Sequence, residues 1–317
     1  DTHHMISDEE FAAMDEDVRL VHASRGGVVN EDAAARAVRE DEIAGAAFDV
    51  FENEPPEEGN PLLEVDNVIV TPHLGASTES AQLNVAETIA VQVIEVLEGG
   101  VAETALNAPS VADEGLQPYL ELAETLGRLV VQIGESNVDE IEVEYAGDIA
   151  DEDVEPLTVA VQKGFLEPIL DDPVNYVNAP TMTEDRGVKV TESKTGHTED
   201  FVSLITVRTR DDDEHEVAGT LFGRNDPTIV LVDGYRVDAP PYGHALIVHN
   251  VDKPGMIGRV GSLLGDHGIN IAGMHNGREK IGGEAIMVLN VDDEVPKDVR
   301  DELTEVEGIV SAKYVSL

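Results

Sequence analysis

The first 76 residues alternate short apolar runs with helical patterns, and this alternation constrains the fold more than any other feature of the sequence. Apolar runs at 18–23, 44–50 and 68–71 predict strands, and residues 31–39 carry alanine and valine on one face of a predicted helix. Parallel strands need crossover connections, which are usually helical. We therefore predict an α/β fold for this part, built on a parallel sheet.

Helices dominate the next part, residues 77–134. They are predicted over 80–97 and 116–133, with an extended stretch at 101–109 between them. The residues Ser77-Thr78-Glu79 begin the first of these helices with a capping pattern.

Two further folded regions follow. Residues 135–241 mix strands and helix, an α+β organisation, with an acidic hairpin tip at 211–214. After Pro240-Pro241, residues 243–317 follow the order strand–helix–strand–strand–helix–strand, which is a ferredoxin-like arrangement. In 135–241 the predicted strands are 140–145, 188–192, 201–209, 216–222 and 228–232, with a helix over 151–170.

Acidic residues outnumber basic ones in nearly every segment: 66 Asp and Glu against 20 Lys and Arg give a formal charge of −46. A disordered acidic chain is one explanation, but the persistent apolar periodicity argues against it. A surface for basic partners is a second. We favour a third, adaptation to a salt-rich (halophilic) cytoplasm, because salt screens the repulsion between carboxylates that keep the surface hydrated. No basic face for nucleic acid and no membrane-spanning apolar run are present in the sequence.

Cysteine is absent from the sequence. Its absence excludes disulfides and thiolate metal sites, and no metal site is predicted. A reducing compartment fits this composition, and the first residues lack the basic start and apolar core of a secretion signal. We therefore expect a cytoplasmic protein.

Three polar residues follow the ends of the strands predicted in the first part: Arg25, Glu54 and His73. Ligands of open α/β sheets bind at the carboxyl ends of the strands, so these side chains are placed where ligands bind. Arginine can hold a carboxylate with two hydrogen bonds, histidine can transfer a proton near neutral pH, and a carboxylate can orient the histidine. Taken alone, Arg25 is equally consistent with an exposed residue before a turn, and a lone histidine is more often structural. The three together favour a catalytic site.

The stretches RGGVVNE, DVFENEP and TPHLGAST, in this order, resemble the signature of the D-2-hydroxyacid dehydrogenases. The resemblance implies a partial Rossmann-like parallel sheet and NAD as cofactor. It implies that His73 is the general acid and base, that Glu54 orients it and favours its imidazolium form, and that Arg25 polarises the keto group and grips the carboxylate. The residues implied at the cofactor are Ala23, Arg25, Asp49, His73 and Gly75.

Other cofactor elements of the resembled family are not found. No G-x-G-x-x-G follows a predicted strand. We therefore expect the chain to be N-terminally truncated and inactive alone, with 1–76 as the C-terminal part of the NAD-binding domain. Residues 77–134 are then the crossing helix and the return to the substrate domain.

The stretch VDKPGMIGRVGSLLGDHGINI at 251–271 closely resembles an ACT domain, a small amino-acid-binding module. The resemblance implies that Asn250, Asp252 and Asn270 bind an effector, L-serine, between two ACT domains of a homo-oligomer. From the residues alone, Asp252 is placed to cap the following helix, and Gly255 leaves helix amides open to a carboxylate. An ACT domain retained only for dimer contacts is the alternative.

The middle region, 135–241, resembles the intervening regulatory domain of the longer phosphoglycerate dehydrogenases. Followed by an ACT domain over 243–317, it implies NAD-dependent oxidation of 3-phosphoglycerate to 3-phosphohydroxypyruvate, the first step of L-serine biosynthesis. One alternative is another D-2-hydroxyacid dehydrogenase, such as a glyoxylate or hydroxypyruvate reductase, which seldom carries an ACT tail. The other is a non-catalytic, amino-acid-sensing regulatory chain, against which the three strand-end residues argue.

Overall fold

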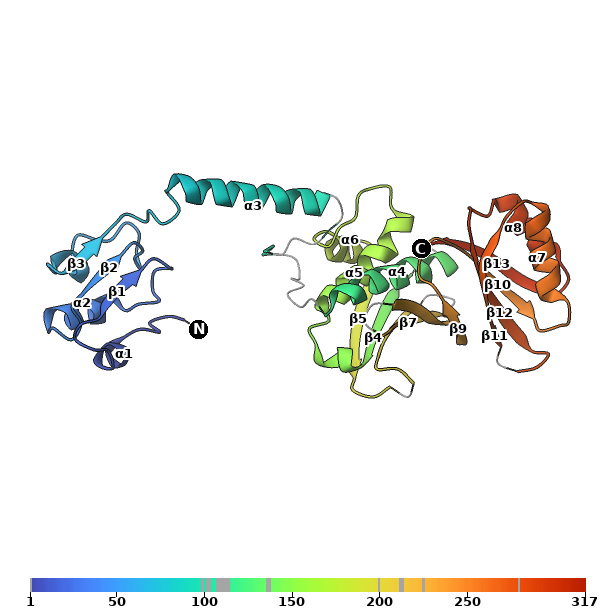
Figure 1. Cartoon of the computed structure of the whole chain (residues 1–317), viewed down its shortest axis with the longest axis horizontal. Helices are drawn as coiled ribbons and strands as arrows, with labels where there is room; N and C mark the ends of the chain where they lie inside the picture. The colour runs from blue at the N-terminus through green and yellow to red at the C-terminus, as the bar shows by residue number, and fades with distance from the viewer. Residues whose placement is uncertain are drawn as a thin grey trace. The chain divides into compact units, whose positions relative to one another are not determined.

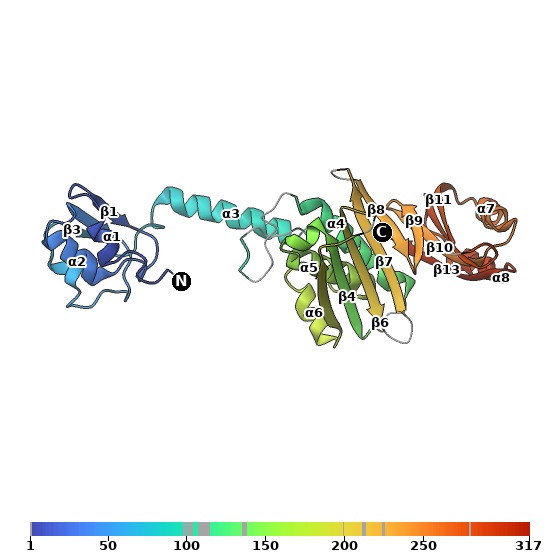
Figure 2. The same cartoon turned by 90° about the horizontal axis from the view of Figure 1, so that it is seen from below.

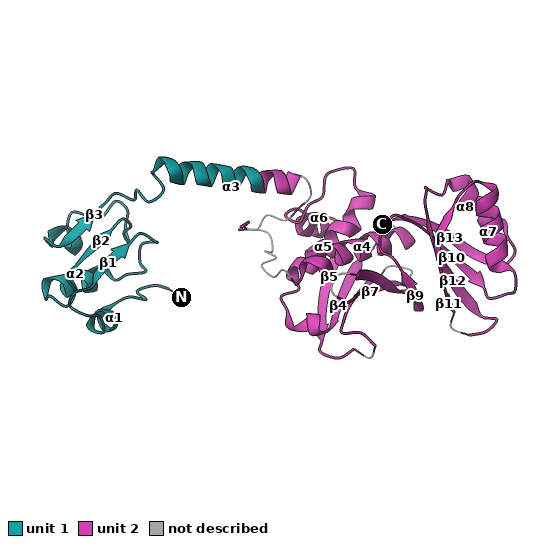
Figure 3. Ribbon diagram, in the orientation of Figure 1, with its two compact units in different colours: residues 1–91 teal, residues 92–317 magenta. Residues whose placement is uncertain are grey.

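The structure is a computed structural model that describes residues 2–97, 100, 104–106, 115–134, 138–198, 200–210, 214–223, 226–278 and 280–317. The chain forms two compact units, residues 1–91 and 92–317 (Figures 1 and 3). The extended stretch predicted at 101–109 and the acidic hairpin tip predicted at 211–214 lie largely outside the described residues. In the described ranges, no helix is both long enough and apolar enough to cross a membrane.

The first unit is built on a three-stranded parallel sheet in the order β1-β2-β3, which confirms the predicted α/β fold. Helix α2 begins where the sequence predicts it, because the Asn30 side chain accepts a hydrogen bond from the Ala33 amide at 3.1 Å. Its buried alanines pack with Phe11 and Phe48 in one apolar core. The elements are α1 (Asp8–Ala12), β1 (Arg19–His22), α2 (Glu31–Arg39), β2 (Gly45–Phe48), η1 (Pro61–Glu64) and β3 (Val68–Val70).

Helix α3 (Glu79–Leu97) has the extent that the sequence predicts, and none of its described side chains is buried. It contains the division between the two units, after Val91. Exposed apolar side chains along it include Leu83, Ile89 and Val93.

The second unit contains a six-stranded sheet in the order β5-β4-β6-β7-β8-β9 (Figure 2). Only the β4–β5 pair is parallel within it. The edge strand β9 was not predicted, although the Asp233-Gly234 pair before it is a typical hairpin turn. The strands are β4 (Glu140–Gly147), β5 (Lys189–Thr195), β6 (Ser203–Arg210), β7 (Glu214–Phe222), β8 (Asp226–Val232) and β9 (Tyr235–Ala239).

Two helices, α4 (Gln117–Ile133) and α5 (Glu155–Leu166), pack closely in this region. A Cβ atom on Gly164 would lie 1.9 Å from the Glu124 carbonyl oxygen, so only glycine permits the approach. Helix α4 shares the buried core of the sheet. That core therefore starts before residue 135, and the sequence-based division at 134/135 stays a proposal.

The helix predicted over 151–170 is shorter in the structure. Its place is taken by the 3-10 turn η2 (Asp148–Asp151), α5 and the 3-10 turn η3 (Glu167–Ile169). Pro168 cannot continue the hydrogen-bond ladder of α5, which explains the change. Helix α6 (Ala179–Asp185) was not predicted.

The last part of the chain has the predicted ferredoxin-like order, with an antiparallel sheet β11-β12-β10-β13. Helices α7 and α8 cover one face of this sheet (Figure 1), where Leu246 and Val248 pack against them. The other face contributes Ala245 and Ile247 to the core that contains α4. The elements are β10 (His244–Val251), α7 (Met256–Asp266), β11 (Ile271–Arg278), β12 (Glu284–Val291), α8 (Lys297–Glu305) and β13 (Ile309–Ser316).

Candidate active site

The loops after β1 and β2 are in direct backbone contact. A Cβ atom on Gly26 would lie 1.8 Å from the Phe51 carbonyl oxygen, so a larger residue would push the loops apart. Arg25 is exposed in the first of these loops, and its Nη1 donates to the Ser24 carbonyl oxygen at 2.7 Å. The arginine therefore stands beside the loop that carries Glu54.

Glu54 and His73, 19 positions apart, meet at this edge of the sheet. Glu54 Oε2 lies 2.7 Å from His73 Nδ1, and Glu54 Oε1 accepts the Phe51 amide at 3.0 Å. The hydrogen bond with His73, followed by that from Phe51, holds the pKa of Glu54 below its ordinary value. The pair leaves His73 Nε2 as the ring nitrogen available to a ligand.

Asp49 holds the turn in which His73 sits. Its Oδ1 accepts the Leu74 amide at 2.7 Å and the Thr71 hydroxyl at 2.5 Å, and its Oδ2 accepts the Gly75 amide at 2.7 Å. These bonds, led by that from Leu74, hold the pKa of Asp49 below its ordinary value. His73 has a φ of 55°, a left-handed conformation that is uncommon outside glycine, and the Asp49 bonds on both sides stabilise it.

Asp49, one of the residues implied at the cofactor, can still accept a hydrogen bond from a polar ligand. A carboxylate has about four acceptor positions, and three on Asp49 are used by the chain, so one remains. A Cβ atom on Gly75 would lie 3.3 Å from Asp49 Oδ2, so glycine keeps the carboxylate accessible. Ala23 is exposed just after β1. This donor and acceptor set fits a carboxamide.

Thr71 is a site residue that sequence reasoning did not single out. Its hydroxyl donates to Asp49 Oδ1 from the residue directly after β3. Its place two residues before His73 could have indicated a role in the turn, because short hydroxyl side chains at strand ends often stabilise turns.

The three residues implied at the effector have separate contacts. Asn250 is buried, with Nδ2 donating to the Val251 carbonyl and Oδ1 lacking a hydrogen-bond partner among the described residues. Asn270 Nδ2 donates to Asp292 Oδ2 at 2.7 Å. None of these bonds joins one of the three residues to another.

Asp252 does not cap helix α7, which corrects the expectation. The N-cap is Gly255, with a φ of 91°, and no side chain caps the helix there. The Asp252 carboxylate instead accepts the Gly282 amide and Arg278 Nη1, each at 3.1 Å, and these two bonds lower its pKa. Asp252 therefore fixes the β11–β12 turn in this state.

Family comparisons cover three parts of the chain. Residues 1–75 match the model described as "D-isomer specific 2-hydroxyacid dehydrogenase, NAD binding domain". Residues 115–233 match the "D-3-phosphoglycerate dehydrogenase intervening domain", and 244–308 match the ACT domain.

Relatives resemble the chain along its entire length. D-3-phosphoglycerate dehydrogenases of Methanocaldococcus jannaschii and Archaeoglobus fulgidus are each 41% identical to it, over 100% and 99% of this chain and 60% of their own length. The chain is similar to these D-3-phosphoglycerate dehydrogenases from one end to the other. The D-3-phosphoglycerate dehydrogenase of Bacillus subtilis is 37% identical over 100% of this chain and 61% of its own length. The chain thus spans about three fifths of the length of these relatives.

Proposed function

We propose that the protein takes part in NAD-dependent oxidation of 3-phospho-D-glycerate to 3-phosphohydroxypyruvate, the first step of L-serine biosynthesis. The observation that carries the proposal is the 2.7 Å contact between Glu54 and His73 at the carboxyl edge of the sheet. The intervening and ACT domains downstream favour this substrate over other 2-hydroxy acids.

Each residue has a chemical task in this reaction. Bound NAD supplies the hydride acceptor. His73 Nε2 removes the proton of the substrate hydroxyl, and in the reverse direction returns it to the ketone oxygen. Glu54 compensates the positive charge that His73 then carries, and Arg25 grips the substrate carboxylate. Asp49, Gly75 and Ala23 hold the carboxamide of the cofactor.

Regulation belongs to the ACT domain in this proposal. L-serine is the effector, with Asn250, Asp252 and Asn270 at its site, and the chain forms a homo-oligomer through ACT domains. The chain has 66 acidic and 20 basic residues, which supports a salt-rich cytoplasm as the place where it acts. Salt ions there would screen the repulsion between the carboxylates.

The test joins the 317-residue chain to the part of the Methanocaldococcus jannaschii relative that the chain does not match. The chimera should reduce NAD when 3-phosphoglycerate is added, and His73→Ala should lower kcat by roughly 10²–10⁴-fold, the usual contribution of acid–base catalysis. A His73→Ala chimera as active as its parent would remove His73 from the reaction.

Substrate preference separates the alternatives. A glyoxylate or hydroxypyruvate reductase would reduce those ketoacids and leave 3-phosphohydroxypyruvate unused. A regulatory chain without catalysis would bind an amino acid while the chimera stays inactive and folded.

A further inference from the structure

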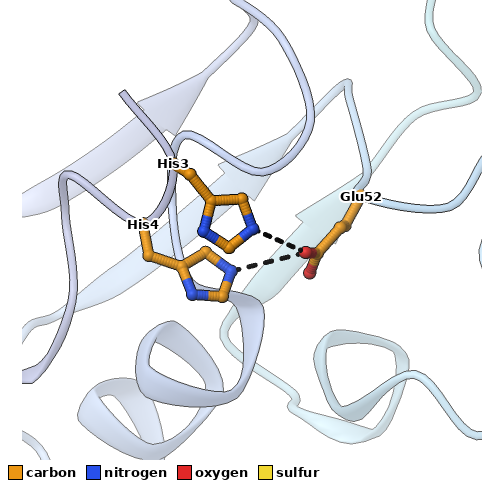
Figure 4. A group of neighbouring side chains, drawn as sticks. All are labelled: His3, His4 and Glu52. Atoms are coloured by element: carbon orange, nitrogen blue, oxygen red, sulfur yellow. Dashed lines mark hydrogen bonds and ion pairs between the residues drawn. The ribbon is translucent and has the colours of Figure 1, made fainter. Parts of the chain in front are cut away.

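His3, His4 and Glu52 form a side-chain group that the dehydrogenase site does not use. His3 Nε2 lies 3.2 Å from Glu52 Oε1, and His4 Nε2 lies 3.5 Å from the same oxygen (Figure 4). The two imidazole rings stack with their centroids 3.9 Å apart. In the part of the chain that the structure describes, no other three histidine, aspartate or glutamate ligand atoms lie within 4.8 Å of one another.

The backbone holds the two sides of this group in place. The His4 amide donates to the Gly27 carbonyl at 2.7 Å, which fixes the N-terminal segment beside the loop after β1. The Glu52 amide donates to Glu31 Oε1 at 2.6 Å, which ties the loop after β2 to helix α2. The side chains therefore meet on backbone that is anchored on both sides.

The distances between the ligand atoms match those around a tetrahedral metal ion. Zinc lies about 2.0–2.1 Å from histidine nitrogen and about 2.0–2.2 Å from carboxylate oxygen, so neighbouring ligands of a tetrahedral site are about 3.4 Å apart. The nitrogen–oxygen distances of 3.2 and 3.5 Å lie on either side of this value.

Burial supplies a second, independent observation. His4 Nε2 is shielded from solvent and makes no hydrogen bond, although it points at Glu52 (Figure 4). A buried polar atom without a hydrogen bond is costly unless something else satisfies it. The His3 side chain is 61% exposed, so a cation can enter and keep a water molecule as its fourth ligand.

We propose that His3, His4 and Glu52 bind one divalent transition-metal cation of the zinc class. Two imidazoles and a carboxylate are ligands that zinc accepts without cysteine. The sequence predicted no metal site, because His3 and Glu52 are 49 positions apart. The bound cation clamps the N-terminal segment to the loop that carries Glu54, two residues beyond Glu52.

A proton shared between the histidine rings and the Glu52 carboxylate would explain the same contacts without a metal ion. Asn30 Nδ2 lies 3.5 Å from His4 Nδ1, and a donor there favours a proton on Nε2. Metal binding needs that proton on Nδ1 instead. A contact of 3.5 Å is at the outer limit of a hydrogen bond, so it opposes the metal only weakly.

Zinc titration of the 317-residue chain separates the two explanations. It is carried out with a chromogenic competitor, excess Mg²⁺ and about 1 M KCl, so that the many surface carboxylates do not hold zinc by charge alone. One zinc per chain should bind, and His3→Gln or Glu52→Gln should weaken it by about tenfold or more, since each removes a ligand. The His3 side chain is 61% exposed and that of Glu52 is 43% exposed, and circular dichroism checks that the variants fold.

The matched control is His267→Gln. His267 Nε2 lies 2.8 Å from Glu302 Oε2, a histidine–glutamate pair of similar exposure with no second histidine in its group among the described residues. This variant should bind zinc as the unmodified chain does, and Co²⁺ in place of zinc should give the visible absorption of a four-coordinate ion. Absence of a saturable site, or equal zinc affinity in Glu52→Gln and the unmodified chain, overturns the proposal and leaves the shared proton.

Discussion

Glu54 Oε2 lies 2.7 Å from Nδ1 of His73, while the other oxygen of Glu54 is held by the Phe51 amide. The carboxylate is thus fixed by its own loop before it contacts the imidazole. This fixes the ring orientation and directs Nε2 away from Glu54, which is the geometry that a general acid and base needs.

Replacing Glu54 with glutamine tests this relationship. The amide would keep the shape of the side chain but lose the negative charge that compensates the charge of His73 when it holds the substrate proton. In the chimera, the Glu54→Gln variant should therefore have a kcat at least tenfold lower than the parent, roughly 1.4 kcal/mol in the barrier. The measurement is kcat for the oxidation of 3-phosphoglycerate. An unchanged kcat would remove Glu54 from this role.

Asp49→Asn tests the turn that holds His73. Asparagine offers one acceptor oxygen instead of two, so at least one of the bonds from Leu74, Thr71 and Gly75 is lost. We expect kcat to fall at least tenfold, roughly 1.4 kcal/mol in the barrier, with the pH profile kept in shape. Thr71→Val, which removes only the hydroxyl donor, should have a smaller effect. Equal kcat in Asp49→Asn and the parent would contradict the positioning role.

Asp233 should make the stability of the second unit depend on pH. Burial alone would raise its pKa, but the hydrogen bonds with His215 and His249, at 3.1 and 3.4 Å, outweigh it and hold the pKa below its ordinary value. A carboxylate with a depressed folded-state pKa stabilises the protein above its unfolded value, about 3.9, and this stabilisation is lost as pH falls below it.

Thermal melting between about pH 7 and pH 3 checks this expectation. Asp233→Asn should lower the stability near neutral pH by about 1.5–3 kcal/mol, the typical contribution of hydrogen bonds to a charged group. The difference from the unmodified chain should begin to shrink below about pH 3.9, where Asp233 takes up a proton in the unfolded chain, since its pKa in the folded chain is lower. A difference that stays constant down to the lowest pH would show that the charge of Asp233 is not involved.

The acidic surface should make stability rise with salt. At about 0.1 M salt the Debye length is about 10 Å, and at about 1 M it is about 3 Å, so added KCl screens the repulsion from a charge of −46. The thermal midpoint should increase from about 0.1 to about 2 M KCl. A flat or falling midpoint would contradict the adaptation to a salt-rich cytoplasm.

L-serine should stabilise the chain if the ACT residues bind it. A ligand at a hundredfold excess over Kd adds about 2.7 kcal/mol. The whole chain is used, because Ala245 and Ile247 of β10 pack into the core shared with α4, and an isolated ACT domain would expose them. Asn270→Ala, an exposed position, should reduce the shift in melting temperature. No shift with millimolar serine would contradict the choice of effector, and a full shift in Asn270→Ala would contradict the site.

Sequence alone determined the type of each long element. The parallel sheet of the first unit and the ferredoxin-like order of the last part follow from local apolar patterns, because each strand and helix buries its own face. The short strand β9 and helix α6 escaped prediction, since tertiary packing stabilises them more than their own sequence does.

Motifs at the three strand ends also predicted Arg25, Glu54 and His73 as site residues, because the carboxyl edge of a parallel sheet is set by the chain direction. Only the tertiary structure decided which atoms meet. In the structure, Asp49 accepts three hydrogen bonds from the turn that contains His73. Asp252 binds the Gly282 amide and does not cap a helix, and His3 and His4 lie next to Glu52. These contacts join residues far apart in sequence, and their geometry depends on how the loops pack, which no local pattern encodes.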